Sequence, residues 1–163
     1  MYPVLNEVFS HHIKQPLYDI LIADIDNNNF MIKVNHSAYD ILSRCNGNNS
    51  ITDIKNKLFE EYDESMDVLS DFVDSFLDDS ARYGHIYYIK DPQELRPKLS
   101  KNGAYDFWTP EYVVLELTYA CPLRCKHCYQ AKMTPCTMDD RLIEETIHEL
   151  IDMGVQHVQL TGG

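Results

Sequence analysis

Three cysteines on one short segment carry most of the chemical information in this sequence. Cys121, Cys125 and Cys128 have the spacing C-x3-C-x2-C and follow directly after the apolar run at 112–117. Gaps of three and two residues let a single loop curl so that three sulfurs surround one centre. Three protein ligands leave one coordination position of a metal centre open, and an open position is typical of catalytic sites. The spacing therefore predicts a reactive metal centre.

Two metal centres are compatible with these thiols. A four-iron cluster held by three cysteinates keeps one iron free for a substrate or a cofactor. The alternative is a structural zinc site, in which Cys136 or His127 would supply the fourth ligand. Structural zinc sites usually pair their ligands as two separated units, and this segment has only one such unit. The pattern favours the iron-sulfur cluster and leaves zinc as the alternative.

The segments around the cysteines predict a strand-helix-strand unit. Residues 112–117 are apolar and β-rich, as in a parallel strand buried on both faces. Residues 137–140 read as a helix N-cap at Thr137, and helical apolar spacing then runs to a stop at Gly154. Residues 155–160 form a second strand candidate. The cysteines would then lie at the C-terminal end of the first strand, where parallel barrels have their active sites.

Residues 112–163 resemble the start of a radical S-adenosylmethionine (SAM) enzyme, because the family's C-x3-C-x2-C motif is matched by Cys121, Cys125 and Cys128. The resemblance implies a [4Fe-4S] cluster on these three thiolates, with SAM bound to the iron that lacks a cysteine. It assigns no catalytic residue beyond the cluster and SAM site. It also implies cofactor contacts near the motif and at the start of a Gly-Gly-Glu type motif, which here are His127, Tyr129, Thr161, Gly162 and Gly163. His127 departs from the aromatic residue usual before the third cysteine.

The resemblance also implies how such a centre is used. In the family, reductive cleavage of SAM gives a 5'-deoxyadenosyl radical that removes a hydrogen atom from a substrate, and the electron comes from a donor such as flavodoxin or ferredoxin. A complete barrel needs on the order of 200 residues, and about 50 are present here. We therefore expect residues 112–163 to be the N-terminal part of a truncated barrel, poorly active or inactive in isolation.

The first two-thirds of the chain predicts a small α+β domain over residues 1–90. Two strand candidates at 18–25 and 30–34, joined by the turn-rich residues 26–29, predict a hairpin. Three amphipathic helices and a strand or wing at 85–89 follow. Such a sheet with three helices predicts a winged helix-turn-helix domain. Residues 91–111 contain Pro92, Pro97, Gly103 and Pro110 without apolar periodicity, which predicts a linker.

The apolar and turn positions of this domain, over about residues 15 to 90, are similar to those of PqqD-like precursor-recognition domains. The matching positions are Val34, Asn35, Ala38, Ile41, Leu42, Cys45, Asn46, Gly47, Ile51, Ile54, Leu58, Tyr62, Tyr83 and Gly84. The resemblance implies that the leader segment of a precursor peptide binds as an added strand at the sheet edge. Here the edge would be Phe30–Val34 and the facing helix Met66–Leu77.

Two features of that helix have competing interpretations. Met66, Leu69 and Val73 would form the wall that faces the leader, or they would be ordinary core. Three acidic positions of the helix would favour a basic leader, or they would be a solvated face; these are Asp67, Asp71 and Asp74. An exposed strand edge offers unpaired backbone groups to a peptide, which supports the strand-addition mode in either case.

Charge and composition limit the partners. The net charge is −12, and residues 1–97, with 8 basic and 17 acidic residues, carry −9 of it. Such a field argues against nucleic acid. Five cysteines, three of them in one loop, predict a reducing compartment rather than a disulfide framework. The first residues show no basic region followed by an apolar stretch, and no apolar run approaches membrane-spanning length, so we expect a cytoplasmic protein without a membrane partner.

Together these patterns predict a radical SAM peptide maturase that acts on a ribosomally synthesised precursor peptide. A thioether cross-link, a carbon-carbon cross-link or an epimerised residue would all begin with the same hydrogen abstraction. Two alternatives stay open. One is a radical SAM enzyme with a non-peptide substrate, and the other is a peptide-binding module with a vestigial or zinc-filled cysteine loop.

Overall fold

The computed structural model describes residues 1–25, 28–95, 97–132 and 134–163. The chain divides into two compact units, Met1–Lys101 and Asn102–Gly163. Helices and strands occur in both units, which confirms the predicted mixture of α and β structure. Half of the turn predicted at 26–29, residues 26 and 27, lies outside the described residues.

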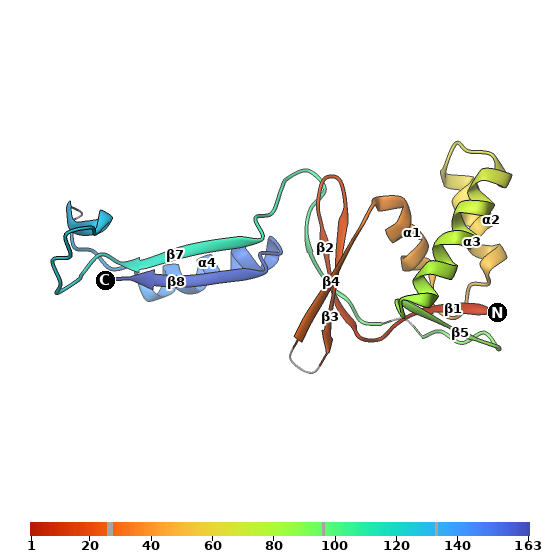
Figure 1. Cartoon of the computed structure of the whole chain (residues 1–163), viewed down its shortest axis with the longest axis horizontal. Coiled ribbons are helices and arrows are strands. Elements are labelled where there is room, and N and C mark those ends of the chain that lie inside the picture. Colours follow the sequence, from red (N-terminus) through yellow and green to blue (C-terminus); the bar gives the residue numbers. More distant parts are fainter. Residues whose placement is uncertain (26–27, 96, 133) are drawn as a thin grey trace. The chain divides into compact units, whose positions relative to one another are not determined.

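Among its described residues, the first unit contains three helices and strands of two small sheets (Figure 1). Its elements in chain order are β1 (Tyr2–Leu5), β2 (Phe9–Lys14), β3 (Asp19–Ile25), β4 (Asn28–Val34), α1 (His36–Arg44), α2 (Ile51–Glu61), α3 (Met66–Arg82) and β5 (Ile86–Ile89). The strand β6 (Ser100–Gly103) spans the boundary between the two units.

The larger sheet has the strand order β4-β3-β2-β6. β3 and β4 pair antiparallel, with Ala23 opposite Phe30, so the predicted hairpin is present. Among the described strands, β4 has a partner on one side only. The strand that the sequence predicts as a peptide-binding edge is therefore an edge strand of this sheet.

The smaller sheet pairs β1 with β5, and Leu5 lies opposite Ile86. The sequence predicts a strand or wing at 85–89, but its partner β1 was not predicted, and β5 does not join the hairpin. Nor was β2 predicted, whose pairing with β3 is irregular between Phe9 and His11. The winged arrangement of the predicted fold is thus not confirmed, although the α+β class is.

Side-chain caps set the helix starts of the first unit. The side chain of Asn35 accepts from the backbone N–H of Ala38 at the start of α1. Ser50 and Asp53 form a reciprocal capping box at α2. α3 ends where Gly84 adopts a positive φ of 75°, which favours glycine.

The helices bury one continuous apolar core against both sheets. The predicted stripe of α1 is buried, and its last member, Cys45, is 1% exposed. Burial raises the pKa of the Cys45 thiol to about 12, so the thiol stays protonated and acts as a small apolar group. The fully buried core is formed by Leu5, Phe9, Leu21, Ala23, Ile41, Leu42, Cys45, Ile54, Leu58, Leu69, Val73, Leu77 and Ile86.

Part of the segment predicted as a linker, 91–111, packs on the first unit. The backbone N–H of Gln93 donates to the carbonyl of Gly47 at 2.9 Å, and that of Leu95 donates to Asn46 at 2.8 Å. Further along, β6 adds a strand to the larger sheet. Gly47 has a φ of 76°, and a Cβ there would lie 2.3 Å from the carbonyl oxygen of Gln93. The Asn-Gly turn therefore serves as a docking point for the chain that leaves the domain.

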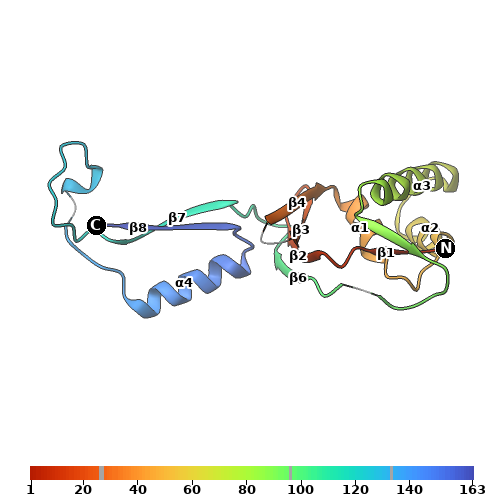
Figure 2. The same cartoon turned by 60° about the horizontal axis from the view of Figure 1, so that its bottom comes forward.

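The second unit is a strand-helix-strand arrangement. Its elements are β7 (Tyr112–Thr118), the short 3-10 helix η1 (Tyr129–Lys132), α4 (Asp140–Asp152) and β8 (His157–Gly162). β7 and β8 pair in parallel, and α4 runs along one face of the pair (Figure 2).

One detail of the predicted helix is wrong. The N-cap of α4 is Asp139 and not Thr137, whose hydroxyl instead bonds to that of Thr118 at 2.8 Å. Gly154 ends the helix with a φ of 85°, as predicted. Within the described ranges, no helix combines the length and the apolar character that crossing a bilayer requires.

Candidate functional site

The loop between β7 and α4, residues 119–139, is here called the cysteine loop. Cys121, Cys125 and Cys128 line one hollow of about 500 Å³ in this loop, here called the thiol hollow. Cys125 is exposed, the other two are partly exposed, and all three are free thiols. The structure therefore brings the predicted metal ligands to the wall of one solvent-accessible space.

These residues fit a metal cluster in their chemistry. Three thiols on one short segment are the donor set that iron-sulfur clusters use. The three thiols do not converge on one point in this structure. In the described part of the chain, no three His, Cys, Asp or Glu side chains are grouped closely enough to hold a metal ion. Cys136 and His127, the candidate fourth ligands of a zinc site, are exposed and do not line the thiol hollow.

The base of the cysteine loop is closed by backbone contacts. Tyr119 donates its backbone N–H to the carbonyl of Cys136 at 2.8 Å, and Met138 donates to Leu117 at the same distance. The hydroxyl of Thr118 also donates to the carbonyl of Cys136, at 3.1 Å. Cys136 thus contributes its backbone to the loop, while its thiol is exposed.

The predicted glycine pair lies against the end of β7. The backbone N–H of Gly163 donates to the carbonyl of Thr118 at 2.8 Å. Gly162 has a φ of 148°, and a Cβ there would lie 2.8 Å from the same carbonyl oxygen. Since Thr118 closes the base of the cysteine loop, the Gly-Gly end of β8 sits where that loop begins. Thr161 pairs with Glu116 one step earlier along the strands.

Glu116 is hydrogen-bonded to the cysteine loop. The hydroxyl of Tyr129 donates to its Oε1, and the side-chain amide of Gln130 donates to that hydroxyl. The bond from Tyr129 holds the pKa of the Glu116 carboxyl below its usual value, because it stabilises the charged form. Sequence reasoning missed Glu116, although an acidic residue inside the apolar run 112–117 was the available signal.

The first unit has an apolar pocket between its three helices, here called the helix pocket, of about 300 Å³. Its floor consists of buried core side chains, and its rim carries exposed ones. The pocket is lined by Ser37, Ile41, Leu58, Tyr62, Glu64, Val68, Leu69, Phe72 and Val73. Such a concave, mostly apolar space fits one or two apolar side chains of a ligand.

The exposed apolar face of α3 differs from the one predicted. Leu69 and Val73 are buried, so for these two residues the interpretation as ordinary core is the right one. The exposed side chains at the rim are instead Val68 and Phe72, at 59% and 45% exposure. The ring of Phe72 stacks on that of Phe76 with centroids 6.2 Å apart. This face, Val68, Phe72 and Phe76, is here called the α3 apolar stripe.

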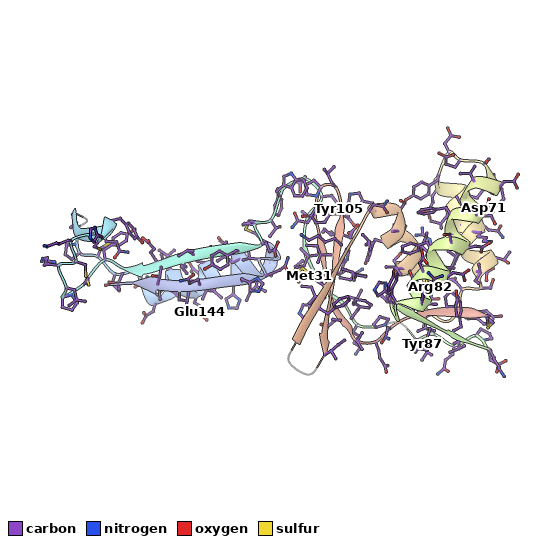
Figure 3. The ribbon with its side chains drawn as sticks, in the orientation of Figure 1. Met31, Asp71, Arg82, Tyr87, Tyr105 and Glu144 are labelled. Atoms are coloured by element: carbon purple, nitrogen blue, oxygen red, sulfur yellow. The ribbon has the colours of Figure 1, made fainter. Side chains whose placement is uncertain are left out.

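The acidic residues of α3 lie on a different face of the helix from this stripe. Asp67, Asp71 and Asp74 are all exposed, at the spacing i, i+4, i+7. Asp74 is paired with Lys55 of α2 at 2.7 Å. Figure 3 labels Asp71, which has no charged partner among the contacts that the described residues make. Only part of the predicted acidic patch is therefore free to attract a basic peptide.

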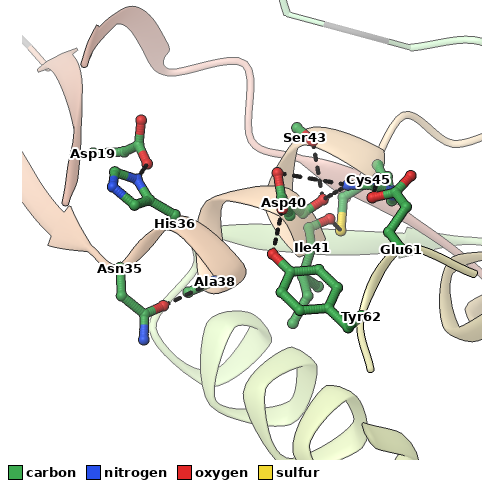
Figure 4. Close-up of polar contacts among 11 residues, drawn as sticks. Asp19, Asn35, His36, Ala38, Asp40, Ile41, Ser43, Cys45, Glu61 and Tyr62 are labelled. Carbon is green, nitrogen blue, oxygen red and sulfur yellow. Dashed lines mark hydrogen bonds and ion pairs between the residues drawn. The ribbon is translucent and has the colours of Figure 1, made fainter. Parts of the chain in front are cut away.

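A buried polar cluster joins the start of β3 to the start of α1. Asp19 is fully buried, and one of its oxygens bonds to His12 at 2.6 Å. Its other oxygen bonds to His36 at 2.7 Å (Figure 4). The hydrogen bond to Asp19 raises the pKa of His36. His12 also stacks on Tyr39 with ring centroids 3.9 Å apart. No partner of His12 could be predicted, because its contacts are 7 or more residues away along the chain.

A second polar cluster ties α1 to the rim of the helix pocket (Figure 4). The hydroxyl of Tyr62 donates to Asp40 at 2.5 Å, and Arg44 bonds to Glu61 at 2.5 Å. Burial, helped by the bond to Asp40, raises the pKa of Tyr62 to about 12. Tyr62 therefore stays a neutral donor, and it holds one wall of the helix pocket in place.

Two comparisons with known proteins found similar sequences. Residues 21–86, from β3 to the first residue of β5, match the family described as coenzyme PQQ synthesis protein D (PqqD). The whole chain is 25% identical, over 178 aligned residues, to the antilisterial bacteriocin subtilosin biosynthesis protein AlbA of Bacillus subtilis (strain 168). The chain spans 38% of the length of that relative. The two comparisons confirm the predicted resemblance to a PqqD-like domain joined to a radical SAM peptide maturase.

Proposed function

We propose that this chain, with its PqqD-like region ahead of a C-x3-C-x2-C loop, belongs to an enzyme that modifies a ribosomally synthesised precursor peptide. The first unit would bind the leader of the precursor, and the second would hold a [4Fe-4S] cluster and SAM. The observation that carries the proposal is their combination in one chain: a PqqD match over residues 21–86 and three thiols that line one hollow.

The exposed edge of β4 supports leader binding. An edge strand has unpaired backbone N–H and C=O groups, which an extended peptide satisfies by adding a strand. The α3 apolar stripe and the helix pocket offer places for alternate side chains of that peptide. A leader with apolar residues two positions apart would thus use both the edge and the pocket.

The thiol hollow supports cluster binding. Cys121, Cys125 and Cys128 would ligate the iron, and Gly162 and Gly163, which approach the end of β7, would help to position SAM. When bound, the cluster and SAM supply a 5'-deoxyadenosyl radical that abstracts hydrogen from the substrate. His127, Tyr129 and Thr161 remain proposed cofactor contacts. An electron donor such as flavodoxin or ferredoxin would serve the cluster.

Linking the two units in one chain has a kinetic consequence. A captured leader keeps its core peptide near the cysteine loop, so the core segment needs little affinity of its own. The bond formed in the product, whether a thioether or a carbon-carbon cross-link, would then depend on the core sequence rather than on the leader.

The test uses the full-length protein and a synthetic peptide of the precursor encoded beside its gene. Anaerobically reconstituted protein with SAM and a reductant should convert the peptide to a product that mass spectrometry detects as a loss of hydrogen. Removing the leader from the peptide should raise the peptide concentration that is needed for the same rate of conversion by at least tenfold. A product formed equally well without the leader would contradict leader capture and favour a radical SAM enzyme with another substrate.

A second candidate is a peptide-binding module whose cysteine loop is vestigial or holds zinc. It is favoured by the match to PqqD, which covers residues 21–86 of the first unit and does not reach the cysteine loop. Iron, zinc and acid-labile sulfide contents of the purified protein discriminate the two candidates.

A further inference from the structure

Glu116 is placed to control the shape of the cysteine loop. It lies on β7, two residues before Thr118, where the base of the loop closes. Its carboxylate accepts from the hydroxyl of Tyr129, which directly follows Cys128. One side chain of a regular strand thus binds the far end of the cysteine segment, while the near end continues from the same strand through Thr118.

We propose that Glu116 is a positioning residue that limits the separation of Cys121 and Cys128 by holding Tyr129 against β7. The inference rests on the proposed function, because the proposed function assigns a cluster to the loop. A free loop must lose conformational entropy when three thiols converge on one centre. A loop whose far end is already held against the strand by a carboxylate loses less.

The chemistry of these contacts suits the role. Phenol hydroxyls donate to a charged carboxylate in bonds about twice as strong as those between neutral groups. Glu116 is bonded to a phenol hydroxyl, whereas Arg141, a cation of the same unit, lies near Glu145. Replacing the glutamate should therefore release the loop without breaking an ion pair of the unit.

The first test needs no metal. Trypsin cuts after Arg124 and Lys126, which are both exposed between the outer cysteines. In the metal-free full-length protein, Glu116→Ala and Tyr129→Phe should each raise the cleavage rate at these sites about tenfold, the factor for losing a hydrogen bond to a charged group. The control is Glu144→Gln on α4, an exposed acid away from the loop, which should be cut at the wild-type rate (Figure 3).

The second test measures the cluster itself. Iron and acid-labile sulfide after anaerobic reconstitution, with the visible absorption of the cluster, should fall several-fold in Glu116→Ala and Tyr129→Phe. Glu116→Gln keeps an acceptor oxygen and should restore most of the loading, which a general loss of folding would not allow. Because Tyr129→Phe leaves the strand intact, it reports on the loop even if Glu116→Ala unfolds.

The outcomes separate the two proposals. If the wild type binds no iron, the proposed function fails, and the cleavage rates alone decide the role of Glu116. A second outcome is a wild type with a full cluster and variants with the same iron and sulfide content and the same cleavage rate. That outcome overturns the inference about Glu116, while the proposed function stands. Faster cleavage with lower loading supports both.

Discussion

Replacing Phe72 by alanine should weaken leader binding by about 30-fold. Phe72 lies on the rim of the helix pocket and is 45% exposed. A phenylalanine side chain has about 200 Å² to bury, so a bound peptide could cover roughly 90 Å² of this ring. At about 25 cal/mol per Å², that burial contributes about 2 kcal/mol, which corresponds to the stated change in dissociation constant.

The assay is a fluorescence anisotropy titration of a labelled leader peptide with the full-length protein. Phe59→Ala is the matched control, since Phe59 is 44% exposed on the neighbouring helix α2 but does not line the helix pocket. Thermal unfolding of both variants checks that each is folded at the assay temperature. The control should bind within about twofold of the wild type, because its ring lies outside the proposed site.

Two results would refute the reasoning. Equal weakening by Phe72→Ala and Phe59→Ala would mean that the loss comes from a general effect and not from the helix pocket. Unchanged binding by Phe72→Ala would mean that the peptide does not cover the α3 apolar stripe, and strand addition at β4 would then have to occur without this wall.

Further predictions concern the buried polar cluster and the glycine pair. Asp19→Asn leaves His12 buried without its charged partner and should lower the free energy of unfolding by about 3–5 kcal/mol in urea titrations. Because the pKa of His36 is raised by Asp19, the stability from this bond is complete below the ordinary value of 6.5 and is lost as the pH rises through the higher folded pKa. Urea titrations from pH 6 to 9 should show this decline in the wild type and its absence in His36→Gln, and an identical decline in both would contradict the assignment. Gly162→Ala places a Cβ against a backbone carbonyl and should destabilise the protein more than Gly84→Ala, where a Cβ would have no neighbour within 4 Å. Equal decreases of the melting temperature in the two variants would argue against the close approach.

Local signals in the sequence were sufficient for much of the first unit. The caps at Asn35 and Ser50 and the stop at Gly84 depend on residues within four positions of one another, so the helices could be predicted. The pairing of β1 with β5 joins residues about 80 positions apart. No local pattern encodes such a contact, and the short β1 with Pro3 has little strand signal of its own.

The candidate site shows the same division. Cysteine spacing identified the loop. Periodicity could not show which face of α3 is buried, because both Leu69 with Val73 and the neighbouring Val68 with Phe72 are apolar at helical spacing. Burial distinguishes the two sets. The role of Glu116 depends on the Tyr129 hydroxyl, which reaches back across the loop, so it was visible only once the strand and the loop were placed together.

The central claim is that three thiols of the cysteine loop hold an iron-sulfur cluster. Its most direct measurement is the iron and acid-labile sulfide content of the anaerobically purified full-length protein, compared with Cys125→Ser and with Cys136→Ser as the control. The account predicts about four irons and four sulfides per cluster site in the wild type and in the control, and little of either in Cys125→Ser. A wild-type protein without acid-labile sulfide, or a Cys125→Ser variant that keeps its full content, would contradict it.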